Sequence, residues 1–322
     1  MKELLHCIRT HCCLLGLLLI TLLQPQTHFA QTLTLYVIPP NRPMNWSSPK
    51  KLLFSYINSC VAKSNYKDFK HPLGHVMVEL NDSTRHVITG MVAQSTKAQM
   101  QMVKNKGYGL GVLTAIAPGK LRENTPNAND LLLRYPKGDV AFIRYQLSPE
   151  NFNRLWTYLE EYKNQGFDSM YNGDNKPREG KGAGCSAFGV SFLELAKLLT
   201  PEQEQAWQME VPIQASLLGG PKHEHRFVRW YKIAFTNHWA KSTDSNTYTI
   251  RFFEPKLMYA WIQKQHDDLL QAKHGLAQSV NNLKAKGFVI DCTYHSTINE
   301  PIWLLYHTEE ARRNWENKTK LE

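Results

Sequence analysis

Hydrophobic and polar positions along the chain follow two periods, and each predicts a type of secondary structure. Short apolar or alternating runs, typical of strands, occur at residues 33–38, 74–80, 86–92 and 139–145. Apolar residues spaced three and four apart, typical of helices, occur at residues 49–63, 148–166 and 185–199. Ser148 and Thr200 are each followed by a proline and an acidic residue, which is a helix start signal. Strands and helices alternate irregularly, so we expect an α+β fold.

Residues 74–92 predict a β-hairpin, because two apolar runs flank the turn residues Asn81-Asp82-Ser83. Residues 118–130 are polar and predict a loop. After about residue 215 the sequence becomes rich in aromatic residues, and Gly219-Gly220-Pro221 could form a hinge. Beyond it the pattern predicts strands at 227–235, 248–253 and 288–292, and a helix over 256–284. We therefore expect a main domain over 31–215 and a C-terminal α+β extension over 216–322.

The N-terminus predicts export. Residues 14–23 form an apolar run of about ten residues, with Lys2 and Arg9 before it and polar residues after it. This run is too short to span a bilayer and has the length of a signal-peptide core. We expect a signal peptide over residues 1–30, with an uncleaved anchor as the alternative, and a periplasmic or secreted mature chain.

The chain carries a formal net charge of +10, but its basic residues are scattered and form no long run. This pattern does not indicate nucleic-acid binding. An exported basic protein could instead contact an anionic cell-wall polymer or a membrane surface. We therefore expect no nucleic-acid partner.

Cysteine usage singles out one thiol. Cleavage of residues 1–30 would leave only Cys60, Cys185 and Cys292. In an oxidising compartment two of them could pair and one would remain. Cys60 and Cys292 lie in apolar segments, whereas Cys185 lies in a glycine-rich entry to a helix. The sequence favours Cys185 as the free thiol.

A thiol at a helix N-terminus is a candidate nucleophile, because backbone N–H groups and the helix dipole stabilise the thiolate. Such a thiol also needs a histidine base. His75 follows a glycine and opens an apolar strand, where a sheet can hold its ring. If residues 86–89 approach His75 across the hairpin, His86 could orient that ring, with Glu79, Thr89 or Gln94 as substitutes.

These motifs resemble those of the circularly permuted branch of the NlpC/P60 papain-like superfamily, which includes lecithin-retinol-acyltransferase-like proteins and bacterial lipid-linked hydrolases. GHVMV at 74–78 resembles the Gly-His-Val-x-(Ile/Val) strand of that superfamily, and GCSAF at 184–188 resembles its helix-opening cysteine motif. That branch places histidine before cysteine and a third polar residue about a dozen positions after the histidine. His86 follows His75 by eleven. Gly184 replaces a common asparagine, and the insert at 95–135 is long.

The resemblance implies a papain-like antiparallel sheet packed against helices. It also implies a cysteine hydrolase or acyltransferase that forms a thioester, with Cys185, His75 and His86 as catalytic residues and no cofactor. Either a cell-wall peptide or a lipid acyl group could be the substrate. A non-catalytic binding or scaffold protein with the same fold is the alternative. His223 and His225 would share one face of a strand and could bind a metal, but no third ligand is evident, so we expect no metal.

Overall fold

The computed structural model describes residues 31–304, except 63–65, 67–68, 174–175, 242, 272–276 and 296–299. The expected signal peptide over residues 1–30 lies outside the described residues. The described residues from Gln31 to 304 form one compact unit. In the described part of this unit, no helix is both long enough and apolar enough to cross a membrane.

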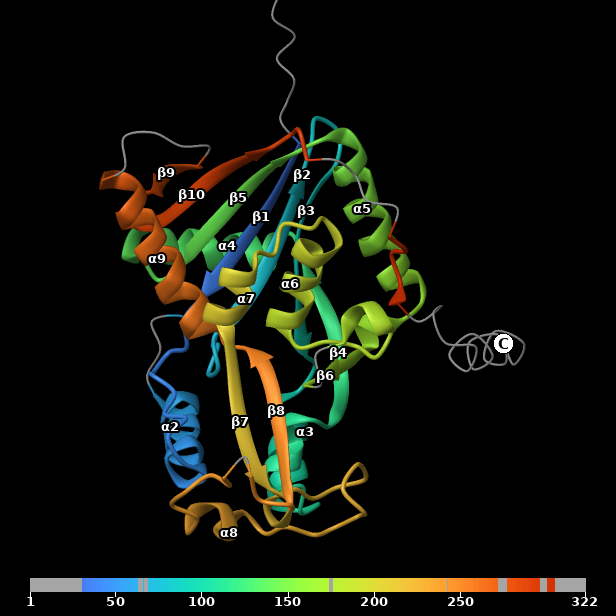
Figure 1. Ribbon diagram of the computed structural model, residues 1–322, viewed down its shortest axis with the longest axis vertical. Coiled ribbons are helices and arrows are strands. Elements are labelled where there is room, and N and C mark those ends of the chain that lie inside the picture. Colours follow the sequence, from blue (N-terminus) through green and yellow to red (C-terminus); the bar gives the residue numbers. More distant parts are fainter. Residues whose placement is uncertain are drawn as a thin grey trace, which may run out of the picture. The chain divides into compact units, whose positions relative to one another are not determined.

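A mixed eight-stranded sheet forms the centre of the unit (Figure 1). Its order is β6-β4-β3-β2-β1-β5-β10-β9. Every neighbouring pair is antiparallel except β5 and β10, which are parallel, so the expectation of a purely antiparallel sheet is corrected. The strands are β1 (Gln31–Ile38), β2 (His75–Asn81), β3 (His86–Ala93), β4 (Ile116–Glu123), β5 (Ala141–Leu147), β6 (Met170–Asn172), β9 (Ala277–Asn282) and β10 (Ala285–Cys292).

A separate two-stranded ribbon pairs β7 (Gln208–Gln214) with β8 (Thr247–Phe253). Strands on the two sides of the expected boundary at residue 215 therefore pair with each other. From the expected C-terminal extension, β10 also adds to the main sheet beside β5. Through these two pairings, strands that follow residue 215 hydrogen-bond with strands that precede it.

Helices cover both faces of the sheet. On one face, α5 (Pro149–Asn164) and α6 (Cys185–Leu195) pack against Val76, Val78 and Leu80 of β2. On the other face, α4 (Thr125–Arg134) packs through Leu131 in a cluster that includes Met77. Successive side chains of a strand point to opposite faces, which explains this division. The remaining helices are α2 (Pro49–Val61), α3 (Thr96–Lys104), α7 (Pro201–Trp207), α8 (Trp230–Ala234) and α9 (Pro255–Gln271).

Three expected segments are corrected. The loop expected at 118–130 forms β4 and most of α4, although Pro118 and Gly119 are poor strand residues. A side chain at Gly119 would collide with the Tyr171 backbone N at 2.7 Å, so the glycine permits β6 to approach β4. The expected helix over 256–284 is observed as α9 up to Gln271, and residues 277–282 and 285–290 pair instead as strands in the sheet. The strand expected at 227–235 instead contains the short helix α8.

Candidate active site around Cys185

Cys185 is the first residue of α6, as the glycine-rich motif predicts. Gly182 has a φ of +72°, and a side chain there would meet the carbonyl oxygen of Met170 at 2.2 Å. Gly189, one turn into α6, lets the helix lie close to the sheet, because a Cβ there would be 2.5 Å from Val76 Cγ1. Gly182 therefore permits the backbone turn that leads into α6, and Gly189 lets α6 pack close to the sheet.

The Cys185 sulfur lies 4.0 Å from the Ser186 hydroxyl oxygen. Burial raises the pKa of the thiol, while the backbone N–H groups of Val76 and Ser186 and the hydroxyls of Ser186 and Tyr171 lower it. Burial dominates, so the thiol is protonated at neutral pH. The two N–H groups would stabilise negative charge on the sulfur or on an oxygen held next to it. Arg122, on β4, adds a positive charge that interacts with the thiolate.

The thiol lines a cleft of about 160 Å³. Glu254 also lines it, and this side chain is almost fully buried. Burial raises the pKa of Glu254, although its Oε2 accepts a hydrogen bond of 2.8 Å from the Leu257 N–H at the start of α9. Most of the remaining wall is apolar and includes Leu73, Leu113, Ile250, Phe252, Phe253 and Pro255.

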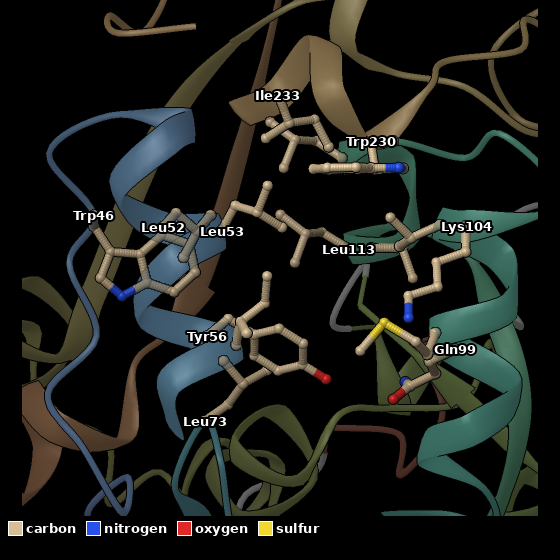
Figure 2. Close-up of a pocket in the computed structure, with 16 residues that line it drawn as sticks. Trp46, Leu52, Leu53, Tyr56, Leu73, Gln99, Lys104, Leu113, Trp230 and Ile233 are labelled. Carbon is tan, nitrogen blue, oxygen red and sulfur yellow. The ribbon is translucent and has the colours of Figure 1, made fainter. Parts of the chain in front are cut away.

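A second pocket, of about 170 Å³, adjoins the cleft (Figure 2). The two share five lining residues, which are Trp46, Leu73, Gln99, Val112 and Leu113. The second pocket is lined mainly by apolar side chains of α2, of α3 and of the segment 109–113, with Trp230 and Ile233 of α8. In Figure 2 the hydroxyl of Tyr56 and the ammonium of Lys104 are among its few polar groups. We call the two pockets together the apolar chamber.

His75 is the first residue of β2, as predicted, and it is buried. Its ring stacks on the ring of His71, with centroids 4.4 Å apart and planes 8° from parallel. Its Nε2 atom is buried without a hydrogen-bond partner. Burial, and then the charges of His71, Arg122 and Arg134, hold the pKa of His75 well below its usual value. The ring is therefore neutral at physiological pH.

The structure does not join His75 to Cys185 by a hydrogen bond. Met77 shares a strand face with His75 and packs on the α4 side, whereas Val76 packs on the α6 side. The ring of His75 therefore lies on the α4 side. A Cβ added at Gly90 would lie 3.3 Å from its Nε2, so the glycine leaves space for the ring. The two residues are nonetheless close in the fold, because Val76, whose backbone acts to lower the pKa of the thiol, directly follows His75. Their catalytic pairing stays a prediction.

His71 leads to a buried ion cluster that the sequence did not predict. Its Nε2 lies 2.7 Å from Asp130 Oδ2, and Arg134 Nε donates to Asp130 Oδ1 at 2.6 Å. Arg122 Nη2 lies 3.5 Å from the same carboxylate. Burial opposes ionisation of Asp130, but the bonds from His71 and Arg134 outweigh it and lower its pKa. Asp130 and Arg134 are spaced i, i+4, which is typical of a helix. Asp130, however, falls in the stretch 118–130 that the sequence predicts as a loop.

His86 does not approach His75. The hairpin register pairs His86 with Asn81, at the far end of β2. Asn81 lies six positions along β2 from His75, or about 20 Å. His86 is exposed, and its Nε2 lies 2.8 Å from Glu79 Oε1. The expectation that residues 86–89 lie opposite His75 is corrected, because the register places the later residues of β3 there.

The other candidate ligands and thiols do not form a metal site. His223 and His225 lie in a turn and not on a strand, and His223 Nε2 contacts Thr114 Oγ1 at 3.1 Å. Nowhere in the described residues do three His, Cys, Asp or Glu side chains gather as a metal would require. Cys60 and Cys292 are free thiols like Cys185. Burial, and then Asp291, raise the pKa of Cys292 to about 11.

Comparison with known proteins returns no match to a family model, a curated protein or a solved structure. The resemblance to the NlpC/P60 superfamily therefore rests on the two motifs and their order in the chain. The candidate site rests on its geometry.

Sequence reasoning missed two groups of this site besides His71 and Asp130. Tyr171 begins the stretch 171–184, which the sequence predicts only as a polar loop, and nothing in its neighbours marks it. Glu254 carries a local signal, because an acidic residue before Pro255 at the start of a helix is typical of a cap. Neither residue has a sequence feature that connects it to Cys185.

Proposed function

We propose that the protein is an exported cysteine hydrolase or acyltransferase that acts on an amide or an ester through a thioester at Cys185. The observation that carries the proposal is the position of the thiol. It opens α6 in the wall of a cleft, where the Ser186 hydroxyl lies 4.0 Å from the sulfur and the backbone of Val76 and Ser186 acts to lower the pKa of the thiol. The finer assignment to a permuted papain-like fold belongs to the same proposal and is supported by the order of the His75 strand and the Cys185 helix.

The reaction would begin with loss of the thiol proton to a base. The thiolate would attack the carbonyl carbon, and the charge on the carbonyl oxygen would be held by nearby N–H donors. Collapse of the adduct would expel the alcohol or amine, which takes up a proton, and would leave a thioester on Cys185. Water or an acceptor alcohol or amine would then release the acyl group and restore the thiol.

His75 is the proposed base, and its part in the reaction requires a movement. In the resting arrangement its ring stacks on His71 on the α4 side. Because the ring lies on the opposite face of the sheet from α6, it would have to leave the stack and the backbone at the start of β2 would have to change before the ring could reach the sulfur and accept the proton. The buried, unpartnered Nε2 supports such a movement, because staying in the stack leaves that atom unsatisfied.

The apolar chamber favours a substrate whose acyl group is apolar. Leu113 lies between the cleft and the second pocket and lines both. An extended hydrocarbon chain bound there would remove apolar surface from water on both partners. A lipid acyl group therefore fits the site better than a charged cell-wall peptide.

A non-catalytic binding protein is the second candidate. It is favoured by the raised pKa of Cys185 and by the absence of a hydrogen bond between the thiol and the His75 ring. In that case the apolar chamber would hold a ligand that is not turned over.

Hydrolysis of p-nitrophenyl acyl esters and acyl anilides by purified protein separates the two candidates. The enzyme proposal expects turnover that falls to background in the Cys185→Ser variant and is retained in the Cys60→Ser and Cys292→Ser variants. Retention of full turnover by Cys185→Ser would refute it. Saturable binding of the same esters without turnover by the parent chain would support the second candidate.

A further inference from the structure

A group of large apolar side chains is exposed around α8. Phe227, Trp230, Tyr231 and Phe235 are exposed by 58, 49, 47 and 80%. Such exposure of four aromatic residues within nine positions is unusual for a surface that faces only water. Helix α2 lies against α8, and the Lys50 N–H donates to the Thr236 carbonyl at 3.0 Å (Figure 1). We call residues 226–241 and 49–61 together the α8 patch.

The α8 patch is also strongly basic. Its two segments contain no aspartate or glutamate. Their basic residues are Lys50, Lys51, Arg226, Arg229, Lys232 and Lys241. Arg226 contacts Glu224, which lies just outside the patch, at 3.7 Å. Lys232 donates to the Ser216 carbonyl, and the Arg229 guanidinium lies 6.0 Å from the centre of the Phe227 ring. These two contacts leave the charges of Lys232 and Arg229 uncompensated.

We propose that the α8 patch docks the protein on the surface of an anionic phospholipid bilayer. Aromatic side chains partition into the headgroup region of a bilayer, where an apolar ring is partly removed from water. Lys and Arg beside them are attracted by the negative surface potential of anionic lipids. A soluble polyanion would explain the cations but would leave Tyr231 and Phe235 exposed, so the bilayer accounts for both features.

The patch adjoins the apolar chamber. Trp230 and Ile233 of α8 line the second pocket, on the side opposite Gln99 in Figure 2. A bilayer bound at α8 would therefore lie next to a pocket that suits hydrocarbon. This connection rests on the proposed function, whereas the docking itself requires only the exposed aromatic and basic side chains.

Co-sedimentation with large unilamellar vesicles tests the docking. We expect the full chain to bind vesicles of 70% phosphatidylcholine and 30% phosphatidylglycerol, and to bind pure phosphatidylcholine vesicles much more weakly. The Arg229→Gln/Lys232→Gln variant should lose about fivefold in partitioning for each charge removed. The Tyr231→Ser/Phe235→Ser variant should lose about tenfold or more, since two aromatic side chains no longer insert.

Matched variants elsewhere on the surface serve as controls. Leu283 and Tyr294 are exposed by 69 and 95%, and Lys120 and Lys284 are exposed lysines outside the patch. Leu283→Ser/Tyr294→Ser and Lys120→Gln/Lys284→Gln should bind vesicles like the parent chain. Equal losses in the control and patch variants would overturn the proposal. So would binding of soluble heparin that matches vesicle binding and ignores the Tyr231→Ser/Phe235→Ser change. Because Cys185→Ser should keep full vesicle binding, failure of the docking and failure of the proposed catalysis are distinguishable.

Discussion

The rings of His71 and His75 stack face to face, with their centroids 4.4 Å apart. Two imidazoles at this distance cannot both carry a proton without strong repulsion. Asp130 Oδ2 lies 2.7 Å from Nε2 of His71, whereas Nε2 of His75 has no hydrogen-bond partner. Burial first, and then the stacked His71, therefore keep His75 neutral, which is the protonation state that a general base requires.

The stack predicts that the protein loses stability as the pH falls below about 6.5. Burial lowers the pKa of both histidines in the folded state, so between the folded values and about 6.5 the unfolded chain binds more protons. The free energy of unfolding must then fall with falling pH, by at most about 1.4 kcal/mol per pH unit for each histidine. Urea denaturation at pH 8, 7, 6 and 5 measures this slope.

The His75→Asn variant isolates one of the two contributions. Its slope below about pH 6.5 should be smaller than that of the parent chain by close to one proton, because the buried ring of His75 is no longer there to stay unprotonated in the folded state. Asp130 titrates in a different window, below about pH 4, and does not disturb the comparison. A parent chain whose stability is flat or rises between pH 7 and 5 would contradict the buried, neutral pair.

Asp130 is the acceptor that joins His71 to Arg134, and all three side chains are buried. Asp130→Asn should cost about 3–5 kcal/mol in the free energy of unfolding, because it leaves the Arg134 charge buried without a counter-ion. Asp268→Asn removes an exposed i, i+4 partner of Lys264 and should leave the free energy of unfolding almost unchanged. Equal effects of the two substitutions, measured by urea denaturation, would show that the buried cluster does not stabilise the fold.

Leu113 lines both halves of the apolar chamber, so a larger side chain there should close the passage between them. We expect kcat/KM of the parent chain to rise with acyl chain length by up to about fourfold per methylene until the chamber is filled. Leu113→Trp should keep activity on acetyl esters and lose the increase for longer chains. Leu132→Trp, on an exposed position of α4, should behave like the parent chain. A parent profile that is flat from acetyl to decanoyl esters would argue against the chamber as an acyl site.

Local signals were enough to predict much of the fold. The Ser148 cap and the paired Thr200 and Gln203 cap mark α5 and α7 correctly, and the turn after Asn81 marks the β2–β3 hairpin. Each of these features depends on residues within a few positions of one another. The parallel pairing of β10 with β5 joins residues about 145 positions apart, and no local pattern encodes it.

The sequence places Cys185 and His75 correctly at the starts of a helix and a strand, but not the groups around them. Hairpin proximity and an offset of eleven residues, which resembles the spacing in the NlpC/P60 branch, indicate His86 as the partner of His75. Register decides that contact, and it is set by the whole pairing of β2 with β3 and β1. The sequence does not indicate Asp130 as a site residue, because no local apolar spacing marks α4 as a helix. Packing on Met77 and Ile88 holds α4 against the sheet.

The acyl-enzyme itself gives the most direct measurement. Intact-mass spectrometry of the protein after brief incubation with p-nitrophenyl octanoate should show one added octanoyl group. Peptide mapping should place that group on Cys185, and neutral hydroxylamine should remove it as expected for a thioester. The adduct should disappear in Cys185→Ser and persist in Cys60→Ser and Cys292→Ser. An unmodified Cys185, or octanoyl groups spread equally over the three cysteines, would contradict a nucleophilic role for this thiol.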